Sequence, residues 1–184
     1  EGKRVVIIGG GDTGSDCVGI ANRQGAASIL QIDRNTKLPE TIDKSLVWPY
    51  WPKQFTISSS QEEGCERDFR IQTKRIEGKR GKVEKIIACR VNSVGGRYVD
   101  EPGSEFSIEA DMVLLAMGFA GPAKEVLDAF GVQRDMAGNV MAAAEGEKRF
   151  QTSVEKVFAA GDTRRGQSLV VWALHEGREC AAAV

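Results

Sequence analysis

Residues 3–14 read KRVVIIGGGDTG, and the predicted fold class follows from this segment. The apolar run from Arg4 to Ile8 predicts a short strand of the kind that lies buried in a parallel sheet. It leads directly into a G-x-G-x-x-G turn, which is made of Gly9, Gly10, Gly11, Asp12, Thr13 and Gly14. A helix is predicted from about Thr13 to Gln24, and a second strand from Ser28 to Asp33. This order has the size of one βαβ unit, and it predicts a Rossmann-like α/β fold.

The three spaced glycines have separate physical roles in such a turn. Gly9 permits the tight turn out of the strand, Gly11 lets the backbone approach a pyrophosphate, and Gly14 lets helix and strand pack closely. The N–H groups at the helix N-terminus offer hydrogen bonds and a partial positive charge to phosphates. We therefore expect dinucleotide binding at this turn. The competing interpretation is a glycine-rich turn with a structural role alone.

The residues after the second strand leave the nucleotide preference open. Asp33 lies about 20 residues beyond Gly14, where a carboxylate would bond the ribose 2′-hydroxyl of NADH. Arg34 and Lys37 follow closely, and cations at this place can hold the 2′-phosphate of NADPH. The alternative for both cations is that they are solvated surface charges.

The middle of the chain predicts an antiparallel insert. Phe69 to Ile76 and Lys82 to Asn92 read as the two arms of a hairpin. Met112 to Met117 then reads as a buried strand that ends at Gly118 and returns the chain to the sheet. The predicted architecture is a three-layer dinucleotide-binding domain with an antiparallel β insert.

A long irregular stretch runs from Asn35 to Glu63, ahead of this insert. A loop of this length inside a domain is usually functional or packs on a partner. Its segment from Trp48 to Pro52 could cover the nucleotide, dock another domain, or plug its own loop.

A second signature, VFAAGD, lies at Val157 to Asp162. It predicts a strand over Lys156–Ala160 that ends in Gly161 and Asp162, and a carboxylate at such a strand end can accept a hydrogen bond from a ribityl hydroxyl of a flavin. The next helix is predicted to open at Gly166, and its N-terminus would face the flavin pyrimidine ring through Gln167, Ser168 and Leu169. The alternative for Asp162 is a loop aspartate that caps a helix. A helix from Ala123 to Phe130 and a short strand from Asn139 to Ala142 complete this part.

The composition and the spacing of the cysteines argue against several classes of function. Contents of 41% hydrophobic and 28% charged residues are ordinary for a globular protein, and a net charge of −1 favours neither nucleic acid nor a membrane surface as a partner. The four cysteines lie too far apart for a C-x-x-C pair, so a dithiol reductase and a zinc site have no support. His175, the one histidine, reads as a surface residue. We expect no catalytic residue and no metal ligand, because hydride transfer to a flavin is chemistry of the cofactors.

Several segments together resemble the small (beta) subunit of glutamate synthase, of the pyridine nucleotide–disulfide oxidoreductase superfamily. The segments are GGGDTGSDCVG, WPYWP, SSSQEEGCERD, EADMVLLAMGF and VFAAGDTRRGQSLVVWALHEGR. The resemblance implies an NAD(P)H-binding domain over residues 1–117. It implies that residues 118–184 form the C-terminal part of an FAD-binding domain, with Gly118 at the crossing.

The resemblance also implies a function and partners. Hydride would pass from NADPH to FAD, and electrons would pass through iron–sulfur centres to the glutamate synthase large subunit in the cytoplasm. There, glutamine and 2-oxoglutarate would give glutamate. The implied partners are this large subunit and the N-terminal FAD and iron–sulfur regions of the same chain.

The single glycine turn sets one further expectation. The chain begins with Glu1 and has no second turn to seat the ADP half of FAD, so we expect a fragment that is colourless and inactive in isolation. The alternative function is a nucleotide-binding or docking module without activity.

Overall fold

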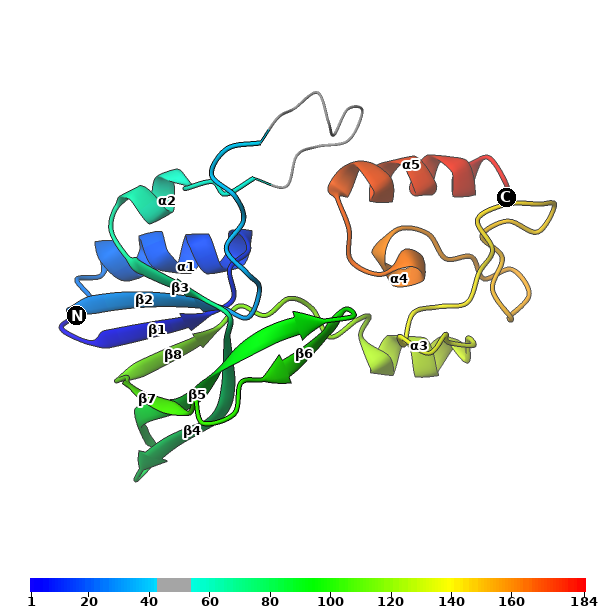
Figure 1. The fold of residues 1–184 in the computed structure, drawn as a ribbon. Helices are drawn as coiled ribbons and strands as arrows, with labels where there is room; N and C mark the ends of the chain where they lie inside the picture. Colours follow the sequence, from blue (N-terminus) through cyan, green and yellow to red (C-terminus); the bar gives the residue numbers. More distant parts are fainter. Residues whose placement is uncertain (43–53) are drawn as a thin grey trace. The chain divides into compact units, whose positions relative to one another are not determined.

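The computed structural model describes residues 1–42 and 54–184, which form two compact units (Figure 1). The first unit is Glu1–Gly118 and the second is Phe119–Val184. Each unit has its own hydrophobic core. The hypotheses on the segment from Trp48 to Pro52 fall outside the described residues. No helix in the described part of the chain is long and apolar enough to cross a membrane.

A parallel sheet forms the centre of the first unit. Its strand order is β3-β2-β1-β8, with β1 at Arg4–Ile8, β2 at Ser28–Asp33, β3 at Glu66–Phe69 and β8 at Met112–Leu115. Helix α1, at Asp12–Arg23, connects β1 to β2. The bounds predicted for β1 and β2 are confirmed, and the predicted helix agrees with α1 to within one residue at each end.

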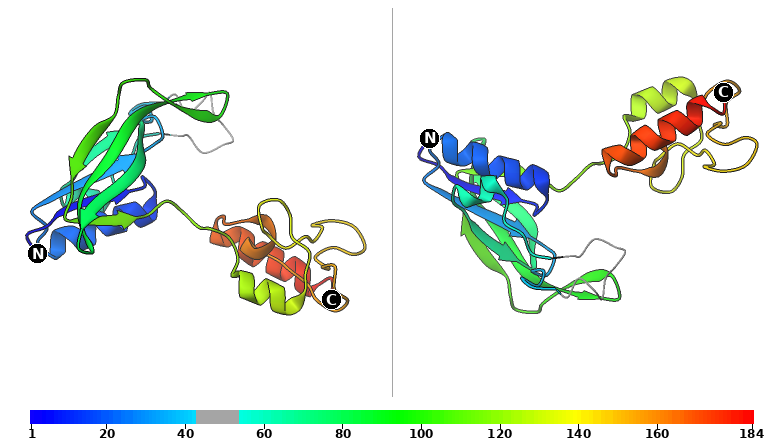
Figure 2. Two further views of the ribbon diagram at one scale, coloured as in Figure 1. Left: turned by 90° about the horizontal axis from the view of Figure 1, so that it is seen from below. Right: turned by 90° about the horizontal axis from the view of Figure 1, so that it is seen from above.

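The two faces of this sheet bury different layers. Val5 and Ile7 pack with Val18 of α1 on one face, while Val6 and Ile8 pack with Ile86 of the antiparallel sheet on the other. Successive side chains of a strand point to opposite faces, so the continuous apolar run of β1 supplies both cores. The views in Figure 2 show α1 and the antiparallel strands on opposite sides of the sheet. The predicted three-layer α/β architecture is confirmed.

The antiparallel insert is built around one long strand. Strand β5, at Lys82–Val94, pairs with β4 at Ile71–Lys79, with β6 at Arg97–Asp100 and with β7 at Phe106–Glu109. The short helix α2, at Ser59–Glu62, precedes β3.

The expectation of one continuous strand from Phe69 to Ile76 is wrong. The chain breaks at Arg70, which adopts a left-handed conformation with φ of +59°, between β3 of the parallel sheet and β4 of the antiparallel sheet. Arg90 of β5 braces the break, because its guanidinium donates to both carboxylate oxygens of Asp68 at 2.7 and 2.8 Å and to the carbonyl of Phe69 at 2.9 Å. This bidentate pair lowers the pKa of Asp68.

The second unit holds three helices among long connections. They are α3 at Lys124–Phe130, α4 at Asp162–Arg165 and α5 at Val170–Ala181. The core is small, with Leu127, Val132, Val140 and Ala159 buried.

Two strands predicted in this unit are wrong. The segments 139–142 and 156–160 contribute only isolated bridges, Arg134 with Val140 and Gln151 with Phe158. Within residues 119–184 neither segment has a neighbouring strand with which to form a regular ladder.

Candidate functional site

A hollow of about 540 Å³ opens beside the glycine turn, at the carboxyl ends of β1, β2 and β3. Ligands of open α/β sheets bind at this edge. Its lining residues come from the glycine turn, from the ends of β2 and β3, from the described segment before α2, and from Ser93 and Tyr98 of the antiparallel sheet. They include Gly10, Gly11, Asp12, Ser15, Asp33, Asn35, Gln54, Phe55, Thr56, Ser58, Gln61, Arg67 and Phe69.

At two glycines of the turn, backbone atoms occupy the place of a side chain. Gly9 has a φ of +132°, and a Cβ there would lie 2.0 Å from the carbonyl oxygen of Ala116. A Cβ at Gly14 would lie 2.2 Å from the carbonyl oxygen of Gly9. The turn therefore depends on glycine at both positions, since L side chains avoid such contacts and positive φ values.

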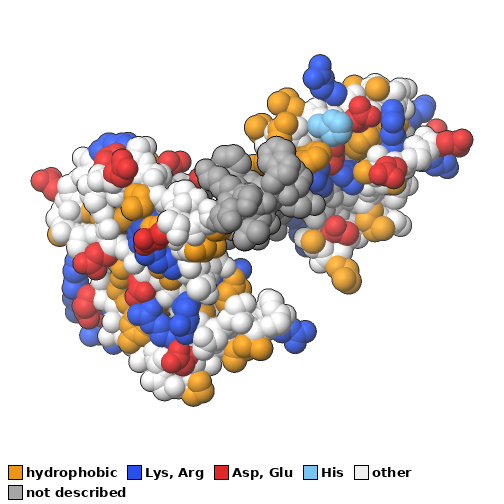
Figure 3. Space-filling model, turned by 45° about the horizontal axis from the view of Figure 1, so that its top comes forward, with side chains coloured by type: hydrophobic (Ala, Val, Ile, Leu, Met, Phe, Trp, Pro, Cys, Tyr) orange, Lys and Arg blue, Asp and Glu red, His pale blue; other side chains and the backbone are white. Residues whose placement is uncertain are grey.

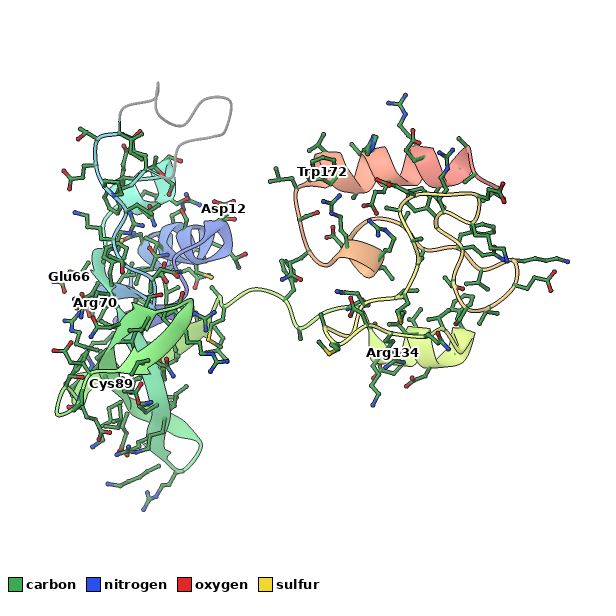
Figure 4. The ribbon with its side chains drawn as sticks, turned by 45° about the vertical axis from the view of Figure 1, so that its right-hand side comes forward. Asp12, Glu66, Arg70, Cys89, Arg134 and Trp172 are labelled. Atoms are coloured by element: carbon green, nitrogen blue, oxygen red, sulfur yellow. The ribbon has the colours of Figure 1, made fainter. Side chains whose placement is uncertain are left out.

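Gly11 differs, because it faces open space. It has a φ of −84°, and nothing lies within 4 Å of its would-be Cβ. It is the N-cap of α1 and has no side-chain cap, while Ser15 N makes the bond to the Gly11 carbonyl at 3.0 Å. The N–H groups of Asp12, Thr13 and Gly14 precede this bond, so the start of α1 (near Asp12 in Figure 4) supplies helix-terminal donors beside the hollow.

Asp33 lies against the turn. A Cβ at Gly10 would meet its Oδ2 at 2.0 Å, so the close approach of the carboxylate requires glycine there. The other oxygen, Oδ1, accepts hydrogen bonds from the backbone N and the side-chain Nδ2 of Asn35, both at 2.9 Å.

Of the described cations Arg34, Lys37 and Arg67, only Arg67 lines the hollow. Arg34 stacks on the ring of Tyr98, with its Cζ 4.6 Å from the centroid. Lys37 pairs with Glu40 at 2.8 Å. Arg67 of β3 does line the hollow, yet sequence reasoning missed it because β3 was not expected in the parallel sheet.

A series of side-chain hydrogen bonds connects the glycine turn to β2, α2 and α1. Gln31 Nε2 donates to the Gly9 carbonyl at 2.8 Å, and Gln61 Nε2 donates to Gln31 Oε1 at 2.7 Å. Gln61 forms a capping box with Ser58, whose hydroxyl contacts that of Ser15 on α1. Gln31, Gln61 and Ser15 are buried. We call this set of four side chains the glutamine–serine chain. The sequence gives no signal for it beyond the S-x-x-Q pattern of a capping box.

The second unit brings some of the predicted flavin residues together. A small hollow of about 170 Å³ is lined by Phe119, Gly121, Pro122, Asp162, Thr163 and Gln167. Ser168 and Leu169 are exposed and do not line it, and α5 begins only at Val170. Gly118 has a φ of +94° at the end of the first unit.

A buried carboxylate that the sequence did not single out holds the Gly161–Asp162 turn. Glu176 of α5 is 4% exposed and accepts hydrogen bonds from Gly161 N at 2.8 Å, from Arg164 Nε at 2.9 Å and from Arg165 Nη1 at 3.0 Å. The bond from Arg164 is the main cause that lowers the pKa of Glu176, against the opposing effect of burial.

The start of α5 exposes an apolar strip. Leu169, Val170, Val171, Trp172 and Leu174 are between 44% and 75% exposed. Hydrophobic side chains gather beside the histidine on this surface in Figure 3. Exposed patches of this kind mark interaction sites.

Comparisons with known proteins place the chain among oxidoreductases. Residues 1–177 match the family described as pyridine nucleotide-disulphide oxidoreductase. The chain is 47% identical over its whole length to the glutamate synthase [NADPH] small chain of Mycobacterium tuberculosis (strain ATCC 25618 / H37Rv), and it spans 37% of that relative. It is 38% identical over its whole length to the glutamate synthase [NADH] of Saccharomyces cerevisiae, of which it spans 9%. The structure of a thioredoxin reductase from T. acidophilum matches all of this chain with a TM-score of 0.63 at 24% identity, over 52% of that protein. The last similarity concerns the fold alone.

Proposed function

The chain belongs to the pyridine nucleotide-disulphide oxidoreductase family, and from that membership we propose that its first unit binds NADPH in an electron-input subunit of glutamate synthase. In this proposal the whole subunit passes a hydride from NADPH to FAD. The electrons then continue through iron–sulfur centres to a large subunit that makes glutamate from glutamine and 2-oxoglutarate. The names of the relatives, glutamate synthase with NADPH or NADH, support the enzyme and the class of nucleotide in this proposal.

One observation carries the nucleotide assignment. The uncapped N-terminus of α1 lies beside a hollow at the carboxyl ends of parallel strands, and Gly11 leaves the approach to it free of side chains. Such a terminus binds a pyrophosphate through backbone N–H groups and the helix dipole. The site we propose comprises Gly9 to Gly14 and Asp33, with Arg34 and Lys37 close to the same strand end.

The residues of this chain bind and orient, and the bound cofactors supply the hydride chemistry. Asp33 would accept a hydrogen bond from a ribose hydroxyl, since it lies against Gly10 at the end of β2. The nucleotide preference is part of the proposal. We propose NADPH, with NADH as the alternative that the name of the yeast relative keeps open.

For the second unit we propose the C-terminal part of a flavin site. Asp162 and Gln167 line the same small hollow, which supports a role for both in contacting the flavin. Gly118, Gly161, Ser168 and Leu169 complete the proposed set. The exposed strip of α5 suits contact with the FAD and iron–sulfur regions that we propose as partners. We propose a cytoplasmic location for the assembled enzyme.

A substitution at Gly11 tests the nucleotide site directly. Gly11→Val adds a side chain where the structure has open space and an extended backbone, so it blocks the approach of a pyrophosphate while the fold persists. We expect the Kd for NADPH to rise at least about tenfold, which corresponds to about 1.4 kcal/mol. Isothermal titration calorimetry measures this change.

Gly177→Ala serves as the matched control, because this glycine on α5 also has nothing within 4 Å of its would-be Cβ. It should bind NADPH as the wild type does. A Gly11→Val protein that keeps its circular dichroism spectrum and binds NADPH with unchanged affinity would contradict the proposed site.

The second candidate function is a nucleotide-binding or docking module without activity. It is favoured by the exposed strip of α5 and by the small size of the flavin-side hollow. NADPH oxidation by the chain with added FAD and an artificial electron acceptor separates the two. Turnover above that of free FAD supports an enzyme, and nucleotide binding without turnover supports the module.

A further inference from the structure

Arg67 is the cation whose position sequence reasoning did not anticipate. It lies on β3, which pairs in parallel with β2, so that Arg67 is level with Gln31 and Phe69 is level with Asp33. Both Arg67 and Asp33 line the hollow, whereas Arg34 and Lys37 do not. The proposed ribose-binding carboxylate and this guanidinium therefore share one hollow.

The guanidinium of Arg67 is held in place before any ligand arrives. Its Cζ lies 4.6 Å from the ring centroid of Phe55 and 5.5 Å from that of Phe69, and Nη1 donates to the Thr56 carbonyl at 3.1 Å. The two rings pack edge to face at 5.9 Å. A planar guanidinium stacked on aromatic rings loses little further freedom on binding, and its remaining donors suit a phosphate.

The other two cations also lie over aromatic rings of the hollow, Lys37 over Phe55 and Arg34 over Tyr98, each at 4.6 Å, but neither lines it. Lys37 is paired with Glu40, whose pKa is lowered mainly by the hydrogen bond from this lysine. Arg34 stacks on Tyr98, whose hydroxyl bonds to Asn35. Lys37 would have to leave Glu40 to bind a phosphate, and neither Lys37 nor Arg34 lines the hollow, whereas Arg67 does.

We propose that Arg67, held by Phe55, Phe69 and the Thr56 carbonyl, binds the 2′-phosphate of the nucleotide and sets the preference for NADPH over NADH. This inference rests on the proposed nucleotide site and names its specificity-determining residue. The two hydrogen bonds from Asn35 to Asp33 are consistent with it, because they offset the repulsion between that carboxylate and a nearby phosphate.

The test compares the Kd values of NADPH and NADH for the wild type, Arg67→Gln, Arg67→Lys and Arg34→Ala, by calorimetry at two salt concentrations. Arg67→Gln should weaken NADPH about tenfold or more, the size of one charged hydrogen bond, and leave NADH within about twofold. Arg67→Lys keeps the charge but loses the planar fork, so its NADPH affinity should be intermediate. Arg34→Ala tests the competing assignment, and it should weaken NADPH less than Arg67→Gln does. In the wild type NADPH binding should depend more steeply on salt than NADH binding, and Arg67→Gln should remove that difference.

Specific results would overturn the inference. Equal weakening of NADPH and NADH by Arg67→Gln would make Arg67 a structural residue, and an unchanged NADPH affinity would exclude it from the phosphate site. A selective loss of NADPH in Arg34→Ala but not in Arg67→Gln would assign the phosphate to Arg34. In all three cases the proposed nucleotide site still stands. If the wild type bound neither nucleotide, the proposed function itself would fail.

Discussion

The space around a glycine decides whether alanine can replace it. Gly14 and Gly177 both lie within helices, but a Cβ at Gly14 would meet the Gly9 carbonyl oxygen while a Cβ at Gly177 would meet nothing. Replacing glycine by alanine is therefore expected to lower the free energy of unfolding at Gly14 and to leave it unchanged or raise it at Gly177. Because alanine has the same helix propensity at both positions, the difference between the two variants measures the packing of the turn.

We expect Gly14→Ala to lower the free energy of unfolding of the first unit by about 1–3 kcal/mol, the usual cost of overpacking. Gly177→Ala should leave stability unchanged or raise it by up to about 1 kcal/mol, since alanine favours a helix over glycine. Urea denaturation followed by circular dichroism measures both. Equal effects of the two substitutions would show that the turn relaxes around the added methyl group.

Glu176 acts at the same scale in the second unit. Glu176→Ala leaves Arg164 and Arg165 without their buried partner and should cost about 3–5 kcal/mol. Glu176→Gln keeps an acceptor for Gly161 N and should cost less. The fluorescence of Trp172, on whose ring Arg165 stacks at 4.6 Å, reports the loss. Full stability in Glu176→Ala would contradict this account.

The pH dependence of the second unit follows from the same residue. The pKa of Glu176 is lower in the folded state than in the unfolded chain, so its stabilising contribution is complete above its unfolded pKa of about 4.3. The contribution is lost as the pH falls through the lower folded pKa. Thermal unfolding of the wild type between pH 7 and pH 3 should show this loss, and Glu176→Gln should lack this component of it.

At the scale of elements, the β4–β5 hairpin has a turn that its own sequence does not favour. Arg80 and Gly81 connect the two strands with φ values of +51° and +75°. Tight hairpin turns that need positive φ at both positions prefer Asn-Gly. Arg80→Asn should therefore stabilise the first unit by about 0.5–1 kcal/mol, whereas Gly81→Ala should destabilise it. Thermal unfolding of both variants checks the prediction, and a lower melting temperature for Arg80→Asn would contradict it.

Some helices and strands could be predicted from the sequence and others could not. The first βαβ unit was predicted well because a continuous apolar run, a glycine motif and a helix stop all agree within about thirty residues. Strand β3 was missed because its residues, ERDF, are mostly polar and because the break at Arg70 depends on Arg90, which is distant in the sequence. Arg67 was missed with its strand. The strands expected at 139–142 and 156–160 had suitable composition, but composition cannot supply a neighbouring strand.

The whole molecule consists of two units with unequal cores. The first unit buries residues on both faces of a sheet, while the core of the second is a cluster of four buried residues. Stability follows the apolar area that is buried, so the second unit should unfold at lower temperature.

Differential scanning calorimetry should therefore show two transitions. Saturating NADPH should raise only the upper one, because a ligand stabilises the unit to which it binds. Glu176→Ala should affect only the lower one. A single transition that moves as a whole with NADPH would show that the two units unfold together.

The glutamine–serine chain has a consequence for protein engineering. The carbonyl of Gly9 is held by Gln31, and through Gln61 and Ser58 this contact reaches Ser15 at the first turn of α1. Transplanting GGGDTG alone into another scaffold would carry the hexapeptide but not the side chains that fix its shape. The smallest portable version of this turn is a discontinuous graft that also includes Ser15, Gln31 and the Ser58–Gln61 capping box.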